Sequence, residues 1–327
     1  MKRRRIHGGT GIAAVLIAAG LLVPAGATAA PAAPGVTTGP ARSIEQTTAT
    51  LTGSVNPNEA GTTYYFEYGT TRNYQGAVPN PPAGAGKGNR AVKVAVAIGG
   101  LSPATKYHYR LVARNAKGTR RGTDRTFTTK RQPLGLSITA SPNPVSPGGD
   151  TTVSGVLNGT DNGGRQVQLQ SNPFPYTQGF QNASNVQLTN ADGTFAFPVL
   201  SVALNTQYRV VLPNQPQVAA PIVTVGVAPR VSMRVKRVRK TARGAIYRFS
   251  GSVTPAHDGS EIAIQRKKGD NWVTVNGTVA KHRSGSASRY SKKVRLRRRG
   301  TYRVFAGTND GDHVQSVSRS VKLRPRR

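Results

Sequence analysis

Basic side chains in the last third of the chain alternate with apolar ones, as in Arg234-Val235-Lys236 and Lys293-Val294-Arg295. This period of two is that of a β-strand, whose successive side chains point to opposite faces of a sheet. If these strands share one sheet, the cations form a stripe on its solvent face, which two basic triplets extend at turns. The predicted polyanion-binding residues are Arg234, Lys236, Arg248, Arg266, Lys267, Lys268, Lys293, Arg295, Arg297, Arg298 and Arg299.

The chemistry of such a stripe is the attraction of polyanions, with release of their counterions and a steep loss of affinity in salt. The expected partners are anionic cell-wall polymers or acidic polysaccharides. Extracellular nucleic acid is less favoured, because few aromatic side chains interleave with the basic ones. The residues leave open an alternative, a solvated face that serves solubility and protects sheet edges.

The net charge of +34 is distributed unevenly along the chain. Residues 229–327 hold 26 Lys and Arg against 5 acids, whereas residues 132–228 hold 2 against 3. Residues 31–131 lie between these extremes, with 14 Lys and Arg against 4 acids. An asymmetry of this size indicates that the last part of the chain has an anionic partner.

Aromatic side chains form the second candidate site, because exposed rings stack on the faces of sugar rings. The glycan-stacking candidates are Trp272, Phe174 and Tyr176. Trp272 also fits a different position, the core tryptophan of a β-sandwich, and this placement is favoured. The other two aromatics lie in a polar loop and are expected to be surface residues.

The residue pattern predicts no catalytic, cofactor or metal site. Only twelve acids occur, the five histidines are scattered, and no spacing pairs two carboxylates or two histidines. Asn309-Asp310-Gly311-Asp312 is expected to form a tight turn, since it lacks the further oxygens of a calcium loop. His108 is expected to be exposed on its strand. An enzyme is therefore not expected.

The N-terminal residues have the pattern of a secretory signal peptide. Lys2-Arg3-Arg4-Arg5 is cationic, residues 11–23 are apolar, and Ala27-Thr28-Ala29 is a small-residue cleavage signal. No later stretch is long enough to span a membrane, so no stable membrane insertion is expected after cleavage. The chain has no cysteine, which excludes disulfides and thiolate metal sites. The protein is predicted to be secreted, and its charge suggests association with the cell surface.

A fragment that recurs about every hundred residues predicts the architecture. Each copy starts with Thr or Ser before a glycine, at Gly53, Gly155 and Gly251, and later reaches a Thr-Tyr or Thr-x-Tyr segment. This period fits tandem β-sandwiches of about 100 residues. The expected fold class is all-β, with three tandem sandwiches.

The first copy carries a family resemblance. The run Leu101-x-Pro103-x-Thr105-x-Tyr107-x-Tyr109-Arg110-Leu111 resembles the tyrosine corner of fibronectin type III domains, of the variety found in secreted bacterial proteins. The resemblance covers about residues 36–129 and implies a spacer, adhesive unit or enzyme accessory. It departs at the usual core tryptophan, whose place an aromatic of residues 64–68 is expected to fill. The two later copies resemble bacterial Ig-like sandwiches.

The predicted organisation is a signal peptide (1–29), a flexible leader (30–42), a fibronectin type III-like sandwich (43–130), an Ig-like sandwich (131–228) and a basic Ig-like sandwich (229–324). Residues 79–89, rich in proline and glycine, are expected to form a loop. The expected function is that of an exported structural or adhesive protein whose last domain binds anionic surface or matrix polymers. The alternative is a carbohydrate-binding accessory of an extracellular system.

Overall fold

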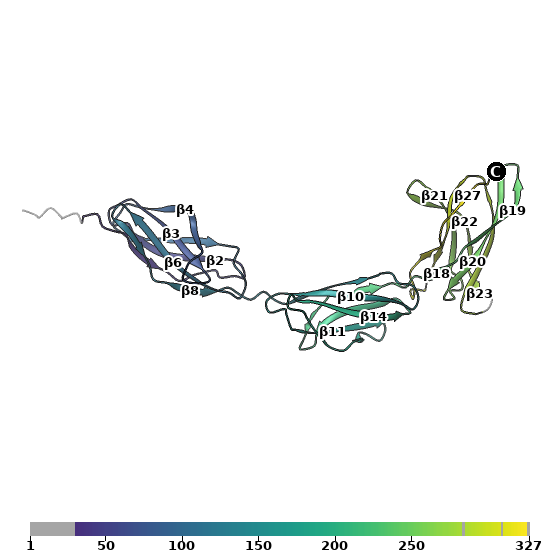
Figure 1. Ribbon diagram of the computed structural model, residues 1–327, viewed down its shortest axis with the longest axis horizontal. Coiled ribbons are helices and arrows are strands. Elements are labelled where there is room, and N and C mark those ends of the chain that lie inside the picture. The colour runs from purple at the N-terminus through teal and green to yellow at the C-terminus, as the bar shows by residue number, and fades with distance from the viewer. Residues whose placement is uncertain (1–29, 283–284, 309, 326–327) are drawn as a thin grey trace, which may run out of the picture. The chain divides into compact units, whose positions relative to one another are not determined.

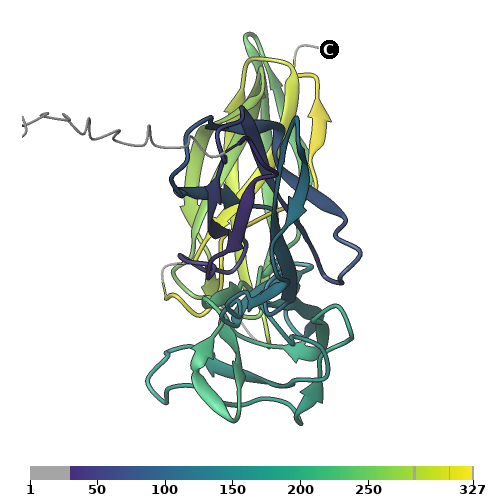
Figure 2. The same ribbon diagram turned by 90° about the vertical axis from the view of Figure 1, so that its left-hand side faces the viewer.

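The computed structural model describes residues 30–282, 285–308 and 310–325, so the predicted signal peptide lies outside the described residues. The described chain consists of β-strands and connecting loops, with no helix in either view (Figure 1, Figure 2). None of its elements is a helix long and apolar enough to cross a membrane. The chain divides into two compact units between Lys130 and Arg131, and both the second and third predicted sandwiches belong to the second unit.

The first unit is a sandwich of two antiparallel sheets. One sheet has the order β1-β2-β5, and the other has the order β4-β3-β6-β7, with β8 also paired to β6. The strands are β1 (Gly35–Thr38), β2 (Ala49–Asn56), β3 (Thr62–Gly69), β4 (Gly76–Gly86), β5 (Val92–Ile98), β6 (Lys106–Asn115), β7 (Gly118–Arg121) and β8 (Arg125–Thr128).

The core of the first unit follows from alternation along β6. Tyr107, Tyr109 and Leu111 are buried and face the other sheet, where they pack with residues such as Leu51. The Tyr107 hydroxyl accepts a hydrogen bond of 2.9 Å from the backbone N–H of Ser102, as in a tyrosine corner. The fully buried ring of Phe66 on β3 provides the core aromatic in this domain without tryptophan.

The expectation of a flexible leader at 30–42 is wrong for residues 35–38, which belong to the first sandwich. Gly35–Thr38 form strand β1, which pairs with β2 from Gly35 opposite Asn56 to Thr38 opposite Gly53. Further back, the side-chain amide of Asn115 donates to the carbonyl of Ala32 at 2.8 Å. The composition of these residues does not predict a strand, because the strand forms only through its pairing with β2.

The loop expected at residues 79–89 is also wrong in large part. Residues up to Gly86 belong to strand β4, in spite of three prolines. This strand lies at the edge of its sheet and pairs only with β3, through a register that shifts twice. Proline lacks a backbone donor, but an edge strand needs donors on one side only, so the prolines are tolerated there.

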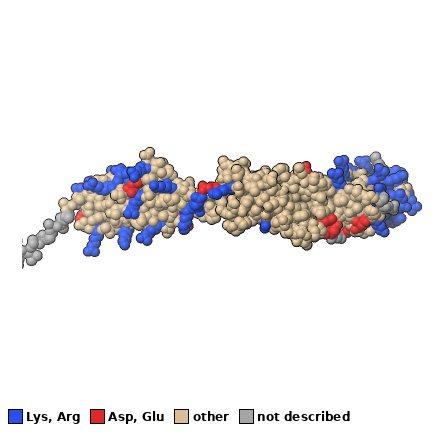
Figure 3. All heavy atoms as spheres, turned by 90° about the horizontal axis from the view of Figure 1, so that it is seen from below, with Lys and Arg blue, Asp and Glu red and all other residues tan. Residues whose placement is uncertain are grey.

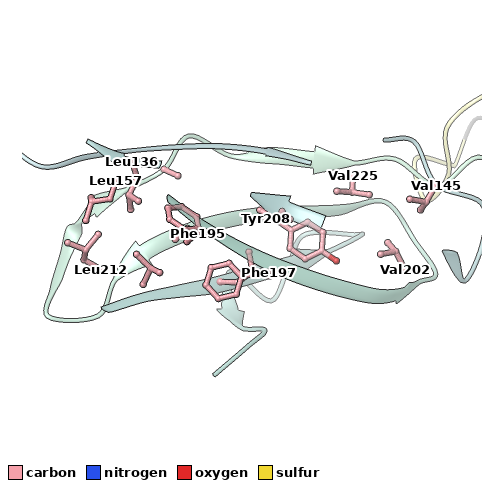
Figure 4. Packing of buried hydrophobic residues seen from close by; sticks show 14 of the residues in the cluster. Leu136, Val145, Leu157, Phe195, Phe197, Val202, Tyr208, Leu212 and Val225 are labelled. Carbon is pink, nitrogen blue, oxygen red and sulfur yellow. The ribbon is translucent and has the colours of Figure 1, made fainter. Parts of the chain in front are cut away.

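The second unit begins with a sandwich whose sheets have the orders β14-β10-β9 and β12-β11-β15-β16. Strand β13 also pairs with β11, and β17 with β15. Figure 4 shows how rings and branched side chains from both sheets, among them Phe195, Phe197 and Tyr208, fill the space between the layers. The strands are β9 (Gly135–Ser141), β10 (Gly149–Asn158), β11 (Gln166–Pro173), β12 (Gln181–Asn182), β13 (Gln187–Leu188), β14 (Thr194–Val202), β15 (Thr206–Leu212), β16 (Gln215–Ala219) and β17 (Val223–Val225).

A second sandwich follows in the same unit, around a separate core that includes Phe249, Tyr290 and Tyr302. Its sheets have the orders β18-β20-β24-β23, with β19 also on β20, and β22-β21-β25-β26, with β27 also on β25. The strands are β18 (Arg230–Val231), β19 (Arg234–Thr241), β20 (Gly244–Thr254), β21 (Glu261–Lys268), β22 (Asn271–Val279), β23 (Lys281–His282), β24 (Ser288–Leu296), β25 (Gly300–Gly307), β26 (Ser316–Val317) and β27 (Val321–Leu323). The described chain is therefore all-β, and we call these three structures the first, second and third sandwiches.

The recurring glycine has the same structural role in each sandwich. A Cβ atom on Gly53, Gly155 or Gly251 would lie 2.7, 2.0 or 2.0 Å from the backbone oxygen of a residue on the neighbouring segment. In the third sandwich that oxygen belongs to Ser232, and it also accepts a 2.7 Å hydrogen bond from the Tyr290 hydroxyl. Only glycine permits this close approach of two backbones.

Replacing Gly251 with alanine is therefore expected to destabilise the third sandwich by about 1 to 3 kcal/mol, because the new methyl group must displace backbone. Gly277→Ala is the matched control, since the nearest atom to its Cβ is an ordinary contact at 3.6 Å; its effect should stay within about 0.5 kcal/mol. The free energy of unfolding can be followed by the fluorescence of Trp272, the chain's single tryptophan. Equal effects of the two substitutions would contradict this role of Gly251.

A polar cluster holds β8 to the first sandwich. Asp124, just before β8, accepts a 2.7 Å hydrogen bond from the Tyr74 hydroxyl and lies 2.9 Å from Nδ1 of His108 and 3.2 Å from Nε of Arg72. Burial alone would raise the pKa of Asp124, but the hydrogen bonds from Tyr74 and His108 and the nearby positive charges hold it below its usual value. His108, expected to be exposed, is thus largely covered, with 18% of its side chain accessible.

The lowered pKa of Asp124 predicts a contribution to stability that is complete above the ordinary carboxyl pKa of about 4 and is lost as the pH falls through the lower folded value. Asp124→Asn should remove this part of the acid dependence. Hydrogen exchange of the β6 and β8 amides at pH 7 and below pH 4 measures the effect. The same loss of protection by acid in the variant and in the unchanged protein would contradict the prediction.

Candidate polyanion-binding surface

The cations of the third sandwich are positioned by the register of three neighbouring strands. In β20, Tyr247 and Phe249 are buried, so the intervening Arg248 points to solvent. Arg248 lies opposite Lys236 of β19 on one side and opposite Lys293 of β24 on the other. Directly opposed residues share a face of the sheet, so these three exposed cations form one row across it.

Further cations flank this row on the same face. One step along β20, Ile246 lies between Arg239 and Arg295, and in the other direction Ser250 lies opposite Arg234. Strands are about 4.8 Å apart and alternate residues of a strand about 6.7 Å apart, so the cations form a close two-dimensional array. We call it the cationic face; its exposed members are Arg234, Lys236, Arg239, Arg248, Arg289, Lys293 and Arg295.

The strands of this sheet carry no carboxylate that could neutralise the cationic face. None of the strands β18, β19, β20, β23 and β24 contains Asp or Glu. Like charges placed directly opposite each other destabilise a sheet, by up to about 1 kcal/mol for a pair. Figure 3 shows Lys and Arg gathered over the third sandwich, whereas the second sandwich has few charged side chains.

The two basic triplets lie outside the cationic face. Arg297, Arg298 and Arg299 form the connection between β24 and β25, and Arg266, Lys267 and Lys268 end β21 in the other sheet. The triplets come together at one end of the sandwich, where a Cβ on Gly300 would lie 3.4 Å from Cγ of Arg266. The Tyr302 hydroxyl donates a 2.7 Å hydrogen bond to the carbonyl of Arg298 and so fixes that connection.

Two members of the cationic face are absent from the sequence prediction. Arg239 joins it through a bulge, because the register between β19 and β20 shifts between Arg237 and Arg239. A strict alternation from Lys236 assigns Arg239 to the inner face, so the sequence alone does not reveal it. Arg289, opposite Ser252, follows the same alternation as Lys293, and extending that pattern backward identifies it.

A groove of about 870 Å³ lies next to this array. Its lining includes Arg234, Arg289 and Lys281, together with the hydroxyl residues Ser250 and Ser252. Guanidinium groups and hydroxyls are the donors that bind phosphate and sulfate oxygens in proteins.

The glycan-stacking candidates do not form a common surface. Trp272 lies on β22 and is half-buried outside the core cluster, so its favoured placement as a core tryptophan is wrong. The guanidinium of Arg303 covers one face of its ring at 4.1 Å, and partial burial lowers the pKa of Arg303. Phe174 and Tyr176, in the second sandwich, pack edge to face against each other at 5.7 Å.

Trp272→Ala is expected to cost about 1 kcal/mol, because it removes one cation–π contact and a half-buried ring. Phe249→Ala, by contrast, removes a fully buried ring and should cost about 3 to 5 kcal/mol. Urea unfolding followed by circular dichroism compares the two variants. If Trp272→Ala lowered the free energy of unfolding as much as Phe249→Ala does, Trp272 would have to be a core residue.

No protein-family model matches the chain, and no curated protein matches it. Among solved structures the chain is similar to the FN1–FN3 domains of chicken CNTN1, with 17% identity over 91% of this chain and 99% of the other and a TM-score of 0.29. Domains A168–A170 of titin give 13% identity over 89% and 99% and a TM-score of 0.34. A tetra-tandem repeat from the extending region of a large adhesion protein gives 15% over 90% and 74%, with a TM-score of 0.28.

Proposed function

We propose that this chain is an exported, non-catalytic structural or adhesive protein whose third sandwich binds anionic polymers of a cell surface or matrix. The row Lys236, Arg248 and Lys293 is the observation that carries the proposal. A folded sheet holds these cations side by side, with no acidic residue on the same strands. A bound polyanion relieves their mutual repulsion and releases its own counterions, so both effects favour binding.

The groove beside the array supports the same chemistry. Arg234 and Arg289 can contact phosphate, sulfate or carboxylate groups as charged donors, while Ser250 and Ser252 add neutral ones. The ligand class is therefore a polymer with repeated oxyanions, either a phosphodiester-bearing wall polymer or an acidic polysaccharide. Export rests on the N-terminal sequence pattern and remains part of the proposal.

The carbohydrate-accessory alternative receives less support from the geometry. Arg303 occupies one face of Trp272, and a Cβ on Gly311 would lie 2.9 Å from the ring of Phe174, so that ring is also partly covered. Each of these rings therefore has less free surface for stacking on a neutral sugar. No observation on the described residues favours this function over polyanion binding.

The test compares two variants of equal charge, both made in the chain from residue 30 onward. One carries Lys236→Gln, Arg248→Gln and Lys293→Gln, and the control carries Lys87→Gln, Arg90→Gln and Lys93→Gln at exposed positions of the first sandwich. Affinity for immobilised heparin and for a purified wall polymer with phosphodiester groups is measured at low ionic strength. Neutral dextran serves as the uncharged comparison.

The variant without Lys236, Arg248 and Lys293 should bind either polymer about tenfold or more weakly, because each lost contact with a sulfate or phosphate group lowers the affinity. The control variant should change affinity by less than about twofold, since distant charges are screened. Equal losses of affinity in the two variants would show that net charge alone determines binding, and would contradict a binding site on the cationic face. Preferential binding of duplex DNA over both polymers would replace the proposed ligand with nucleic acid.

A further inference from the structure

Two of the apparently scattered histidines meet in a buried cluster of the third sandwich. His257 lies between β20 and β21, whereas Asp312 and His313 lie between β25 and β26. The Nε2 atom of His257 is 3.0 Å from Nδ1 of His313 and 3.2 Å from Oδ1 of Asp312, and the last two atoms are 2.9 Å apart. Both imidazoles are almost completely buried, with residue exposures of 6% and 5%.

A hydrogen bond outside the cluster determines the tautomer of His257. Nδ1 of His257 lies 3.0 Å from the carbonyl oxygen of Pro255, which can only accept. That nitrogen therefore carries the proton, and the neutral ring presents the lone pair of Nε2 to Asp312 and His313. A ring held by a backbone carbonyl in this manner is the arrangement found for histidines that ligate metals.

When both imidazoles are neutral, the contacts within the cluster are not all hydrogen bonds. With neutral rings, the N–H at Nδ1 of His313 is the single proton available for three contacts among His257, Asp312 and His313. On its other side, Nε2 of His313 is buried and has no hydrogen-bond partner among the described residues. Binding of a cation at Nδ1 would shift the proton of His313 to Nε2, and the cation would satisfy all three inward-facing atoms at once.

The spacing of the three atoms matches the edges of a small coordination tetrahedron. Zinc–nitrogen distances of about 2.0–2.1 Å and zinc–oxygen distances of about 2.0–2.2 Å place neighbouring ligand atoms about 3.3 Å apart. The three separations of 2.9 to 3.2 Å require only small adjustments to reach that value. Oδ2 of Asp310 lies 3.5 Å from Nε2 of His257 and can provide the fourth ligand.

We propose that His257, Asp312 and His313 form a zinc site, with Asp310 or water in the fourth position. Two imidazoles and one carboxylate suit Zn²⁺, whereas Ca²⁺ takes six to eight oxygen ligands. The ligands come from two connections 55 residues apart, and no local spacing motif joins them. The expectation that Asn309-Asp310-Gly311-Asp312 is only a tight turn leaves out this partnership with His257; Asn309 lies outside the described residues.

Zinc here would stabilise the connection between β25 and β26, which is hydrogen-bonded to the second sandwich. The carbonyl of Asp312 accepts a 2.7 Å hydrogen bond from the backbone of Asn205, and the carbonyl of Gly311 accepts one of 2.9 Å from the Asn205 side chain. The backbone N–H of Val314 donates to the carbonyl of Val227 at 2.8 Å. A metal on Asp312 and His313 therefore braces a segment whose backbone is bonded to the second sandwich on both sides of the ligands.

The test titrates zinc into the metal-stripped chain from residue 30 onward, with calorimetry for stoichiometry and affinity, and thermal unfolding as the second readout. The expected result is one zinc ion per chain, with a rise in the unfolding temperature that saturates at one equivalent. His257→Ala, His313→Ala and Asp312→Asn should each weaken binding by more than about tenfold. His282→Ala is the matched control and should bind like the unchanged chain, since its half-exposed side chain lies outside the cluster.

Cobalt substitution tests the coordination without any mutation that could impair folding. Co²⁺ in the unchanged chain should give the intense visible absorption of a tetrahedral complex, and one equivalent of zinc should abolish it. The proposal is overturned if the unchanged chain takes up no zinc, if cobalt gives only the weak spectrum of an octahedral complex, or if Asp312→Asn and the histidine variants bind zinc as tightly as the unchanged chain. If His282→Ala abolished zinc binding, the metal would lie at the surface, and this result would also overturn the proposal.

Discussion

The alternation of side chains along β20 is the constraint on which the third sandwich depends. Tyr247 and Phe249 point into the core, and Arg248 between them must therefore point out, in register with Lys236 and Lys293. Burial of each aromatic ring stabilises the fold by about 1.5 to 3 kcal/mol, whereas each opposed pair of cations costs up to about 1 kcal/mol. Core burial thus holds the cations together against their repulsion.

The other sandwiches show that this architecture does not require the charge. The glycine that permits close backbone contact recurs at Gly53, Gly155 and Gly251, and each sandwich encloses a core between two sheets. The second sandwich achieves this with almost no charged residues (Figure 3). A sandwich of this kind thus forms a core without a cationic face, so the cations of the third sandwich are not a requirement of the architecture. The proposed binding of a polyanion would account for these cations, which core packing does not require.

Sequence periodicity predicted the all-β fold well, because side-chain alternation is a local consequence of strand geometry and a repeated structural unit leaves a repeat in the sequence. It failed where pairing partners decide the outcome. Strand β1 owes its order to β2, and the prolines of β4 are tolerated because that strand lies at an edge. Arg239 needs a bulge, and His257 meets His313 only through two long connections, so neither placement has a signature in local spacing.

The central claim is that an ordered array of cations in the third sandwich binds polyanions through charge. The most direct measurement is the binding constant of the chain from residue 30 onward for heparin, determined at several salt concentrations. The account predicts that the logarithm of the constant falls linearly with the logarithm of the salt concentration, with a slope of several units. A binding constant that does not change with salt, or no binding even at low salt, would contradict it.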